Sequence, residues 1–101
     1  MTTNFHQISN SEKFDEAKAQ FKERVIRLNP CHKERDLSLN CLDEYYYARD
    51  KCQPYFDNYN NCRRFWGFVT KQRRKEGIKP HLPEPEDRDK VKAQYLPRYK
   101  P

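Results

Sequence analysis

The chain has 101 residues, of which 35% are hydrophobic and 36% are charged, whereas a typical globular domain has roughly 45–50% apolar and about 25% charged residues. One domain is the most that such a chain can build, which excludes a large enzyme with a deep pocket. No apolar run approaches the ~20 residues of a membrane-spanning helix. With two glycines, seven prolines and no sustained β-branched alternation, the sequence predicts helices rather than a β-sandwich.

The formal net charge of +6 is concentrated in the C-terminal part of the chain. Residues 1–62 contain nine Lys or Arg and ten Asp or Glu, whereas residues 63–101 contain twelve and five. Such a basic segment indicates an acidic partner, an anionic membrane surface or nucleic acid, or simply a solvated face. We expect no secretory signal or cleavable matrix presequence, because the first residues lack an apolar core region and the next stretch is rich in acidic residues.

The first 28 residues predict an N-terminal arm with an amphipathic helix. Residues 1–10 are polar and are expected to be disordered, and Ser9 with Glu12 fits the S-x-x-E capping box that begins a helix. Asn29 and Pro30 end the helical pattern. The predicted apolar stripe either packs on the rest of the chain or binds a partner. Its side chains recur at intervals of three and four residues, at Phe14, Ala17, Phe21, Val25 and Leu28.

Residues 29–77 predict a pair of helices, of which the first is expected over residues 34–47. Leu37, Cys41 and Tyr45 follow one another at steps of four and predict the apolar face of this helix. A polar stretch then separates it from the second helix of the pair.

The second helix has the most regular pattern in the sequence. Asp50 or Lys51 is expected to cap it, and Pro54 then falls in the first turn, where its missing N–H costs least. Basic residues in the last turn and Gly77 directly afterwards predict its end near Glu76. The apolar seam alternates spacings of three and four, at Cys52, Tyr55, Tyr59, Cys62, Trp66 and Val69.

Residues 78–101 predict a proline-rich linker and a short C-terminal helix. Three prolines between residues 80 and 85 favour an extended chain, and a helix is expected from Glu86 to Tyr95, stopped by Pro97. We expect changes in this distal tail to leave the fold intact.

The four cysteines are spaced so that they can join two helices side by side. Nine residues separate Cys31 from Cys41, and nine separate Cys52 from Cys62. Ten residues of helix advance ~15 Å, but bridged Cα atoms lie within about 7 Å, so neither pair can bond internally. Facing residues of an antiparallel hairpin have a constant sum of residue numbers, and Cys31 with Cys62 gives the same sum as Cys41 with Cys52. Both bridges fit one register, whereas the remaining pairing demands parallel helices.

These patterns predict an all-α fold, a disulfide-stapled antiparallel helical hairpin with an N-terminal amphipathic helix and a short C-terminal helix. In the loop-entropy model the inner bridge contributes on the order of 3 kcal/mol and the outer somewhat more. Together they are comparable with the whole stability of a small domain. The reduced chain is therefore expected barely to hold its fold.

Other uses of the cysteines fit the spacing poorly. Structural zinc sites take C-x2–4-C pairs, so that one turn presents two thiolates to an ion about 2.3 Å away. A cuprous site or a redox enzyme favours adjacent cysteines or a close, strained pair. We therefore expect no metal, no cofactor and no catalytic residue, and we do not expect an enzyme.

With Cys-x9-Cys twice, each on a predicted helix, the sequence resembles the twin C-x9-C, or coiled-coil-helix-coiled-coil-helix (CHCH), family of the mitochondrial intermembrane space. The resemblance covers residues 29–83 and is carried by NPC at 29–31, CLDE at 41–44, YF at 55–56, NCRRFW at 61–66 and QRRK at 72–75 with the GIKP that follows. A fungal member is counted among the cytochrome c oxidase assembly factors. The resemblance therefore implies a respiratory-chain assembly client, and import and oxidation by the intermembrane-space disulfide relay.

In this family an apolar or aromatic face beside a cysteine is the docking signal for the relay oxidoreductase, so the resemblance implies such a face here. The same side chains also suit the hairpin core. Both roles are possible one after the other, if the face that docks before oxidation is buried in the core afterwards. Cys41→Ser and Cys52→Ser are expected to impair import and folding. The candidates lie three, four and seven residues after Cys52 and Cys62, at Tyr55, Phe56, Tyr59, Phe65, Trp66 and Val69.

A mitochondrial ribosome component or RNA-associated basic protein is the alternative function. No RNA-binding motif accompanies the basic residues, and cations at a helix end are explained by the macrodipole, so we favour an assembly protein and expect no nucleic-acid partner. A third class, a metallochaperone or thiol oxidoreductase, would show free thiols or bound metal. The basic patch, interleaved with aromatic residues, comprises Arg63, Arg64, Lys71, Arg73, Arg74 and Lys75.

Overall fold

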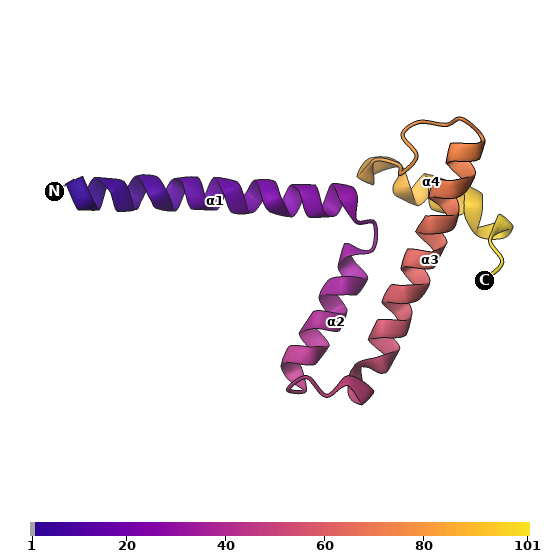
Figure 1. The fold of residues 1–101 in the computed structure, drawn as a ribbon, viewed down its shortest axis with the longest axis horizontal. Helices are drawn as coiled ribbons and strands as arrows, with labels where there is room; N and C mark the ends of the chain where they lie inside the picture. Colours follow the sequence, from indigo (N-terminus) through magenta and orange to yellow (C-terminus); the bar gives the residue numbers. More distant parts are fainter. Residues whose placement is uncertain (1) are drawn as a thin grey trace.

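The computed structural model describes residues 2–101, with side chains from residue 12 onward. These residues contain no strand, and α2 and α3 form an antiparallel hairpin from which α1 extends away (Figure 1). The predicted all-α fold class is confirmed. The elements in chain order are α1 (Thr2–Leu28), α2 (His32–Glu44), the 3-10 turn η1 (Arg49–Cys52), α3 (Gln53–Lys75), η2 (Pro85–Asp87), α4 (Arg88–Tyr95) and η3 (Leu96–Arg98).

Helix α1 begins earlier than predicted. Residues 2–10, for which the sequence predicts disorder, continue the helix back to Thr2. Ser9 and Glu12 therefore lie inside α1, and the capping box is wrong as a start signal. The physical reason is that the chain has no glycine or proline before Pro30, so nothing in this polar stretch breaks a helix.

The arm formed by α1 stands clear of the hairpin (Figure 1). Every residue from 12 to 24 is exposed, and Phe14 and Phe21 keep 67% and 60% of their surface accessible. The interpretation in which the apolar stripe packs on the hairpin is therefore wrong for this stretch. The chain turns away at Asn29, whose carbonyl accepts the His32 N–H at 3.2 Å.

Helix α2 ends at Glu44, before the predicted end at residue 47. Tyr46 and Tyr47 have φ values of 53° and 64°, in the left-handed region that an α-helix cannot continue through. The Tyr47 N–H donates to the Leu42 carbonyl at 2.7 Å. This turn reverses the chain soon enough for Cys52 to return to α2.

Helix α3 begins and ends much as predicted, except at its cap. Cys52, not Asp50 or Lys51, occupies the N-cap position, and Pro54 lies in the first turn. At the other end Gly77 has a φ of 71°, and the Ile78 N–H donates to the Arg73 carbonyl at 2.9 Å. These are features of a Schellman stop, in which glycine tolerates the left-handed conformation.

The tail after α3 folds back and packs against it. Helix α4 lies beside the C-terminal half of α3, close to the end of α1 (Figure 1), and its Val91 and Tyr95 are only 6% and 3% exposed. The expectation that changes in the tail leave the fold intact therefore does not extend to these buried side chains. The tail supplies part of one core, whose buried members are Cys31, Phe65, Trp66, Val69, Val91 and Tyr95.

Candidate functional site

Two disulfides join the helices of the hairpin. Cys31 bonds to Cys62 and Cys41 to Cys52, with Cα–Cα distances of 6.0 and 5.9 Å. This is the pairing that the antiparallel register predicts. Cys31, Cys41 and Cys52 are buried and Cys62 is half-buried. The bonds therefore lie between α2 and α3, where they fix the register of the two helices.

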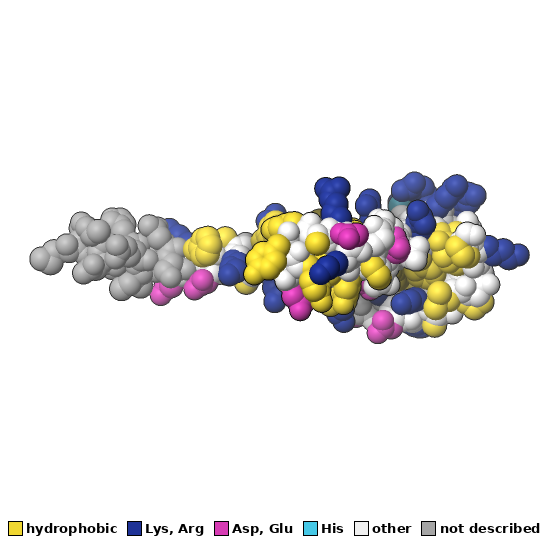
Figure 2. All heavy atoms as spheres, turned by 90° about the horizontal axis from the view of Figure 1, so that it is seen from below, with side chains coloured by type: hydrophobic (Ala, Val, Ile, Leu, Met, Phe, Trp, Pro, Cys, Tyr) yellow, Lys and Arg dark blue, Asp and Glu magenta, His cyan; other side chains and the backbone are white. Residues whose placement is uncertain are grey.

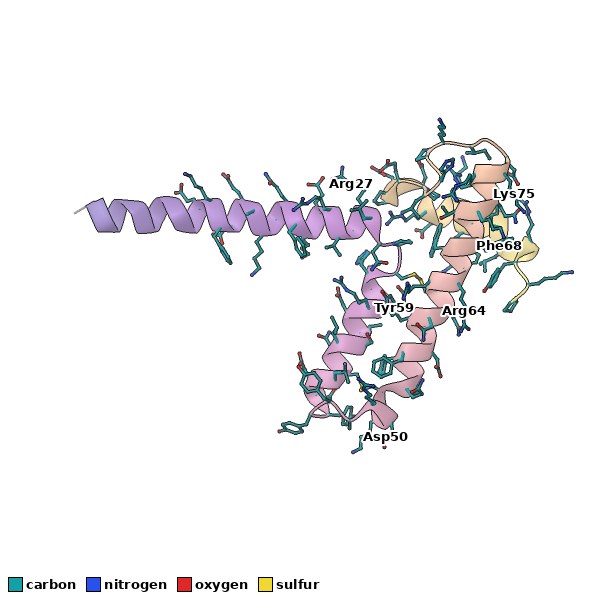
Figure 3. All side chains as sticks on the ribbon, viewed as in Figure 1. Arg27, Asp50, Tyr59, Arg64, Phe68 and Lys75 are labelled. Carbon is teal, nitrogen blue, oxygen red and sulfur yellow. A yellow bond between two sulfur atoms is a disulfide. The ribbon has the colours of Figure 1, made fainter. Side chains whose placement is uncertain are left out.

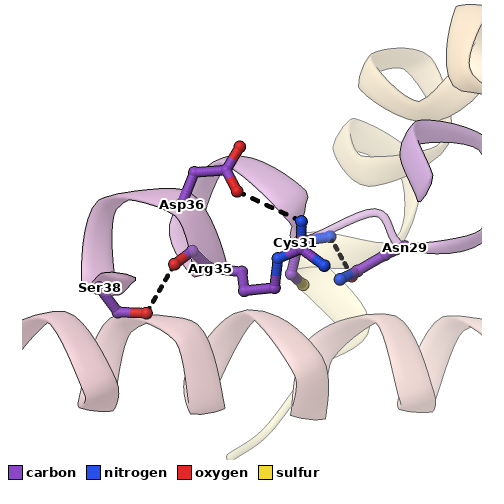
Figure 4. Close-up of polar contacts among 5 residues, drawn as sticks. All are labelled: Asn29, Cys31, Arg35, Asp36 and Ser38. Carbon is purple, nitrogen blue, oxygen red and sulfur yellow. Dashed lines mark hydrogen bonds and ion pairs between the residues drawn. The ribbon is translucent and has the colours of Figure 1, made fainter. Parts of the chain in front are cut away.

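The disulfides also decide which face of α2 is buried. Ser38 lies between Cys31, the N-cap of α2, and Cys41 on the face toward α3, and its hydroxyl donates to the Arg35 carbonyl at 2.7 Å (Figure 4). Leu37, predicted to lie on the apolar face, is 48% exposed. The line from Cys31 through Ser38 to Cys41 faces the partner helix, so Leu37 is left at the edge of the contact.

Two aromatic side chains of α3, Phe65 and Phe68, pack against the tail. The Phe65 ring lies 5.3 Å from that of Trp66 and 5.4 Å from that of Tyr99, both edge-on. Phe68 packs against the Tyr95 ring at 6.5 Å, on the side of α3 that faces the tail (Figure 3). Edge-to-face arrangements of this kind are the favoured geometry of aromatic pairs. Sequence reasoning missed the tail's share of this core, although Val91 and Tyr95 are spaced four residues apart on one helix face.

The six docking candidates fall into two groups in the folded chain. Those beside Cys62, namely Phe65, Trp66 and Val69, are at most 7% exposed. Those beside Cys52 are more accessible: Tyr55 is 42% exposed, and Phe56 and Tyr59 are half-buried. The oxidised fold therefore withdraws the Cys62 group from solvent and leaves the Cys52 group partly open.

Most, but not all, of the residues of the basic patch lie on the surface. Five of its residues are exposed, and Figure 2 shows Lys and Arg side chains gathered on one broad side of the body, at the upper edge of that view. Arg64 lies on the side of α3 away from α2 (Figure 3). Phe65 and Trp66, which would have to stack on bases, are buried. This burial weighs against nucleic-acid binding through the interleaved aromatics.

Two arginines are buried and hold backbone carbonyls. Arg73, predicted as part of the basic patch, is 9% exposed and donates twice to the Pro80 carbonyl, at 3.1 and 2.8 Å. Arg88 is 8% exposed and donates to the carbonyls of Pro83, Ile26 and Arg27. Burial lowers the pKa of Arg88. Arg73 is therefore a structural residue, and Arg88 ties the tail to the end of α1.

Glu76 joins the end of α3 to the tail. Its carboxylate accepts hydrogen bonds from the Tyr95 hydroxyl at 3.1 Å and from Arg98 at 2.8 Å. The hydrogen bond from Arg98, followed by that from Tyr95, holds the pKa of Glu76 below its ordinary value. The same contact raises the pKa of Arg98. No simple sequence pattern relates Glu76 to residues this far along the chain.

One group of side chains has the composition of a metal site. The sulfurs of Cys31 and Cys62 and a carboxylate oxygen of Glu34 lie within 4.8 Å of one another. The two sulfurs are bonded to each other, and a metal binds cysteine as the thiolate. In the oxidised chain this group therefore offers a single carboxylate and does not fit a metal ion.

Comparison with known proteins identifies the family. The chain is 50% identical over 64 residues to human coiled-coil-helix-coiled-coil-helix domain-containing protein 7, an alignment that covers 63% of this chain and 75% of that protein. The mouse protein of the same name is 47% identical over the same lengths. The chain belongs to the coiled-coil-helix-coiled-coil-helix domain-containing protein 7 family. The predicted CHCH resemblance is therefore confirmed.

A second group of relatives of this CHCH chain carries a name that states a role. Cytochrome c oxidase-assembly factor COX23, mitochondrial, of Saccharomyces cerevisiae is 38% identical over 48 residues, which cover 48% of this chain and 32% of that protein. No family model and no solved structure matches the chain.

Among the helices that the structure describes, none combines the length and the apolar character needed to cross a bilayer.

Proposed function

We propose that this CHCH chain is a non-enzymatic mitochondrial protein of the intermembrane space that assists the assembly of cytochrome c oxidase. The observation that carries the proposal is the similarity to the mitochondrial assembly factor of Saccharomyces cerevisiae. The two disulfides that fix the hairpin support it, because such bonds persist in an oxidising compartment. The cysteines serve as structural bonds, and the protein acts by binding an assembly client.

We further propose that the chain is imported reduced and is then oxidised by the disulfide relay. The accessible aromatic residues beside Cys52 support docking at that end of α3, and the buried ones beside Cys62 support a docking face that becomes core after oxidation. Tyr55→Ser tests docking through the residues beside Cys52, because the Tyr55 ring is exposed and loss of this ring leaves the core intact. We expect slower oxidation by the relay enzyme with an unchanged folded spectrum.

Removal of the protein from cells tests the assembly function. The amount of assembled cytochrome c oxidase, measured on native gels, is expected to fall and to recover when the chain is expressed again. A matched control is the same chain with Cys41→Ser and Cys52→Ser, which is expected not to restore the enzyme. Normal oxidase in the depleted cells contradicts the proposal.

Compartment and redox state are tested on isolated mitochondria. The protein is expected to resist protease until the outer membrane is ruptured, and to gain four alkylatable thiols only after reduction. Protection that persists after rupture of the outer membrane places the protein in the matrix and overturns the localisation.

The alternative of an RNA-associated protein receives no support from the structure of the basic patch. Its aromatic residues are buried, and Arg73 is bound to the Pro80 carbonyl. We therefore do not propose a nucleic-acid function.

A further inference from the structure

The apolar stripe of α1 continues into two connected grooves where the arm meets the body. One groove lies between α1 and α2 and includes Phe21, Val25 and Leu28 with Arg24 and Arg35. The other, of about 520 Å³, lies between the end of α1, α3 and the tail and includes Leu28, Trp66, Lys71 and Arg74. Leu28 and Asn29 line both grooves. We call the combined surface the elbow surface, defined by Phe21, Val25, Leu28, Arg24, Lys71 and Arg74.

The elbow surface combines exposed apolar groups with charge of one sign. Leu28 is 70% exposed and Phe21 60%, and Arg24, Lys71 and Arg74 are exposed. No Asp or Glu is among the described residues that line either groove. Among the described basic side chains that line the grooves, Arg35 forms an ion pair, at 3.3 Å with Asp36 (Figure 4). A complementary ligand therefore presents an apolar stripe with carboxylates beside it.

We infer that the elbow surface binds an acidic amphipathic helix of a partner protein. The apolar side chains of that helix lie against Phe21, Val25 and Leu28, and its carboxylates pair with Arg24, Lys71 and Arg74. A helix laid in a groove is read by side chains at intervals of three and four residues, which is the spacing that the stripe of α1 offers. The inference rests on the proposed function as a client-binding protein and names the chemistry of the client segment.

A second copy of α1 does not meet this requirement. At about 100° per residue, Lys18 and Lys22 border the stripe on one side and Arg24 borders it on the other. The carboxylates of Glu12, Glu16 and Glu23 fall on the opposite face of the helix, and Asp15 lies farther from the stripe than Lys18 and Lys22 do. Two arms packed stripe against stripe would therefore bring like charges together, which is destabilising.

A lipid surface fits the shape less well than a helix does. Phe21 and Val25 of α1 line a groove together with Arg35 of α2, so the stripe lies on the side of the arm from which the hairpin projects. A flat bilayer cannot approach the stripe along its length without meeting the hairpin. A single helix of about 10 Å diameter can enter the angle between them.

Fluorescence anisotropy with the full-length oxidised protein tests this inference. The probe is a synthetic helical peptide of about 18 residues, or five turns, with leucines on one face and glutamates beside them. The control peptide carries lysine in place of every glutamate. We expect the acidic peptide to bind at least about tenfold more tightly, and its affinity to fall between about 0.05 M and about 0.5 M salt, as screening predicts.

Pairs of substitutions distinguish binding at the elbow surface from attraction by the net charge of the whole protein. Arg24→Glu with Lys71→Glu is expected to weaken the acidic peptide at least about tenfold, and Phe21→Ser with Leu28→Ser similarly, because the first pair removes the attractive charge and the second the apolar contact. Lys90→Glu with Lys100→Glu makes the same change in net charge at exposed positions outside the elbow surface and is expected to bind the peptide like the native chain. Circular dichroism and thiol counting confirm that each variant is folded and oxidised.

Three outcomes overturn the inference. One is equal affinity for both peptides, and another is an equal loss with the Lys90 and Lys100 variant. The third is failure of the acidic peptide to bind while phosphatidylglycerol vesicles do bind, which assigns the surface to lipid. Expression of the Arg24→Glu and Lys71→Glu variant in depleted cells distinguishes the two proposals. Full recovery of cytochrome c oxidase contradicts client binding by the elbow surface but is still consistent with the proposed assembly function.

Discussion

Arg88 shows how one side chain can place an element that the disulfides do not reach. The last carbonyls of a helix have no partner within it, and Arg88 donates to those of Ile26 and Arg27 at the end of α1. Its remaining contact is the Pro83 carbonyl of the tail at 3.1 Å. The guanidinium, with several donors in a fixed plane, can serve the three carbonyls at once. The arm and the tail are thereby joined without a covalent bond.

Arg88→Met is expected to destabilise the protein by about 2 kcal/mol, because it removes charge-assisted hydrogen bonds in a buried setting while keeping the aliphatic stem. Urea denaturation of the oxidised protein measures this change. Amide exchange at the end of α1 is expected to accelerate in the same variant. Arg64→Met, at an exposed position of α3, is the control and should leave both unchanged; an equal loss there argues against the role of Arg88.

Glu76 predicts a pH dependence of stability. Its pKa is lowered in the folded state by Arg98 and Tyr95, so its contribution is fully present above the unfolded-state pKa and is lost as pH falls through the folded-state pKa. Glu76→Gln should therefore lower the melting temperature at pH 7, and the difference should shrink between about pH 5 and about pH 3. Glu44→Gln, an exposed change on α2, is the control. A difference that stays constant with pH contradicts this account.

At the scale of elements, the two disulfides hold different parts of the molecule. Cys31 belongs to the core that includes Trp66 and Tyr95, whereas the bond from Cys41 to Cys52 closes the turn of the hairpin. The outer bond spans 31 residues of sequence and the inner bond 11. In the loop-entropy model they contribute about 4 and about 3 kcal/mol. Both its position in the core and its longer loop therefore indicate that the outer bond, between Cys31 and Cys62, contributes more to the stability of the core than the inner bond does.

Replacing Cys31 and Cys62 by Ser is expected to expose Trp66, because α2 is then free to leave the core. The matched change at Cys41 and Cys52 should fray the hairpin turn and leave Trp66 buried. The emission maximum of the single tryptophan in each variant measures this directly. Equal red shifts in both variants would show that the core depends on both bonds.

The tail illustrates why element prediction did not reveal packing. Its short helix was predicted over residues 86–95 and is found as η2 and α4, within a residue of those bounds. Its burial against α3 depends on the turn after Gly77 and on the contact of Phe68 with Tyr95, which join residues far apart in sequence. Local periodicity carries no information about such contacts.

At the scale of the whole molecule, the arm makes the protein extended. The chain measures 63 × 39 × 17 Å, with a Cα radius of gyration of 18.7 Å, whereas a compact chain of this length has a radius of about 13 Å. The arm contributes little to the core, because residues 12–24 are exposed. The stability of the hairpin and tail is therefore separable from the arm.

Deletion of residues 2–22 is expected to leave the melting temperature within about 2 °C, because residues 12–22 are exposed and the change keeps the carbonyls that Arg88 holds. The radius of gyration from X-ray scattering should fall toward the compact value. A large drop in melting temperature would show that the arm folds onto the body in solution.

The order of the helices and the covalent frame could be predicted from the sequence, whereas the start of α1 and the end of α2 could not. Equal cysteine intervals and helical rise leave one antiparallel register, so the disulfide pairing and the hairpin followed from local geometry alone. The tertiary structure decided the rest: which side chains of α3 become core, that Arg73 and Arg88 are buried, and that the stripe of α1 stays open. These outcomes depend on how the turns at Asn29 and Gly77 direct α1 and the tail, and the free energy of such long-range packing is not encoded in the spacing of any one segment.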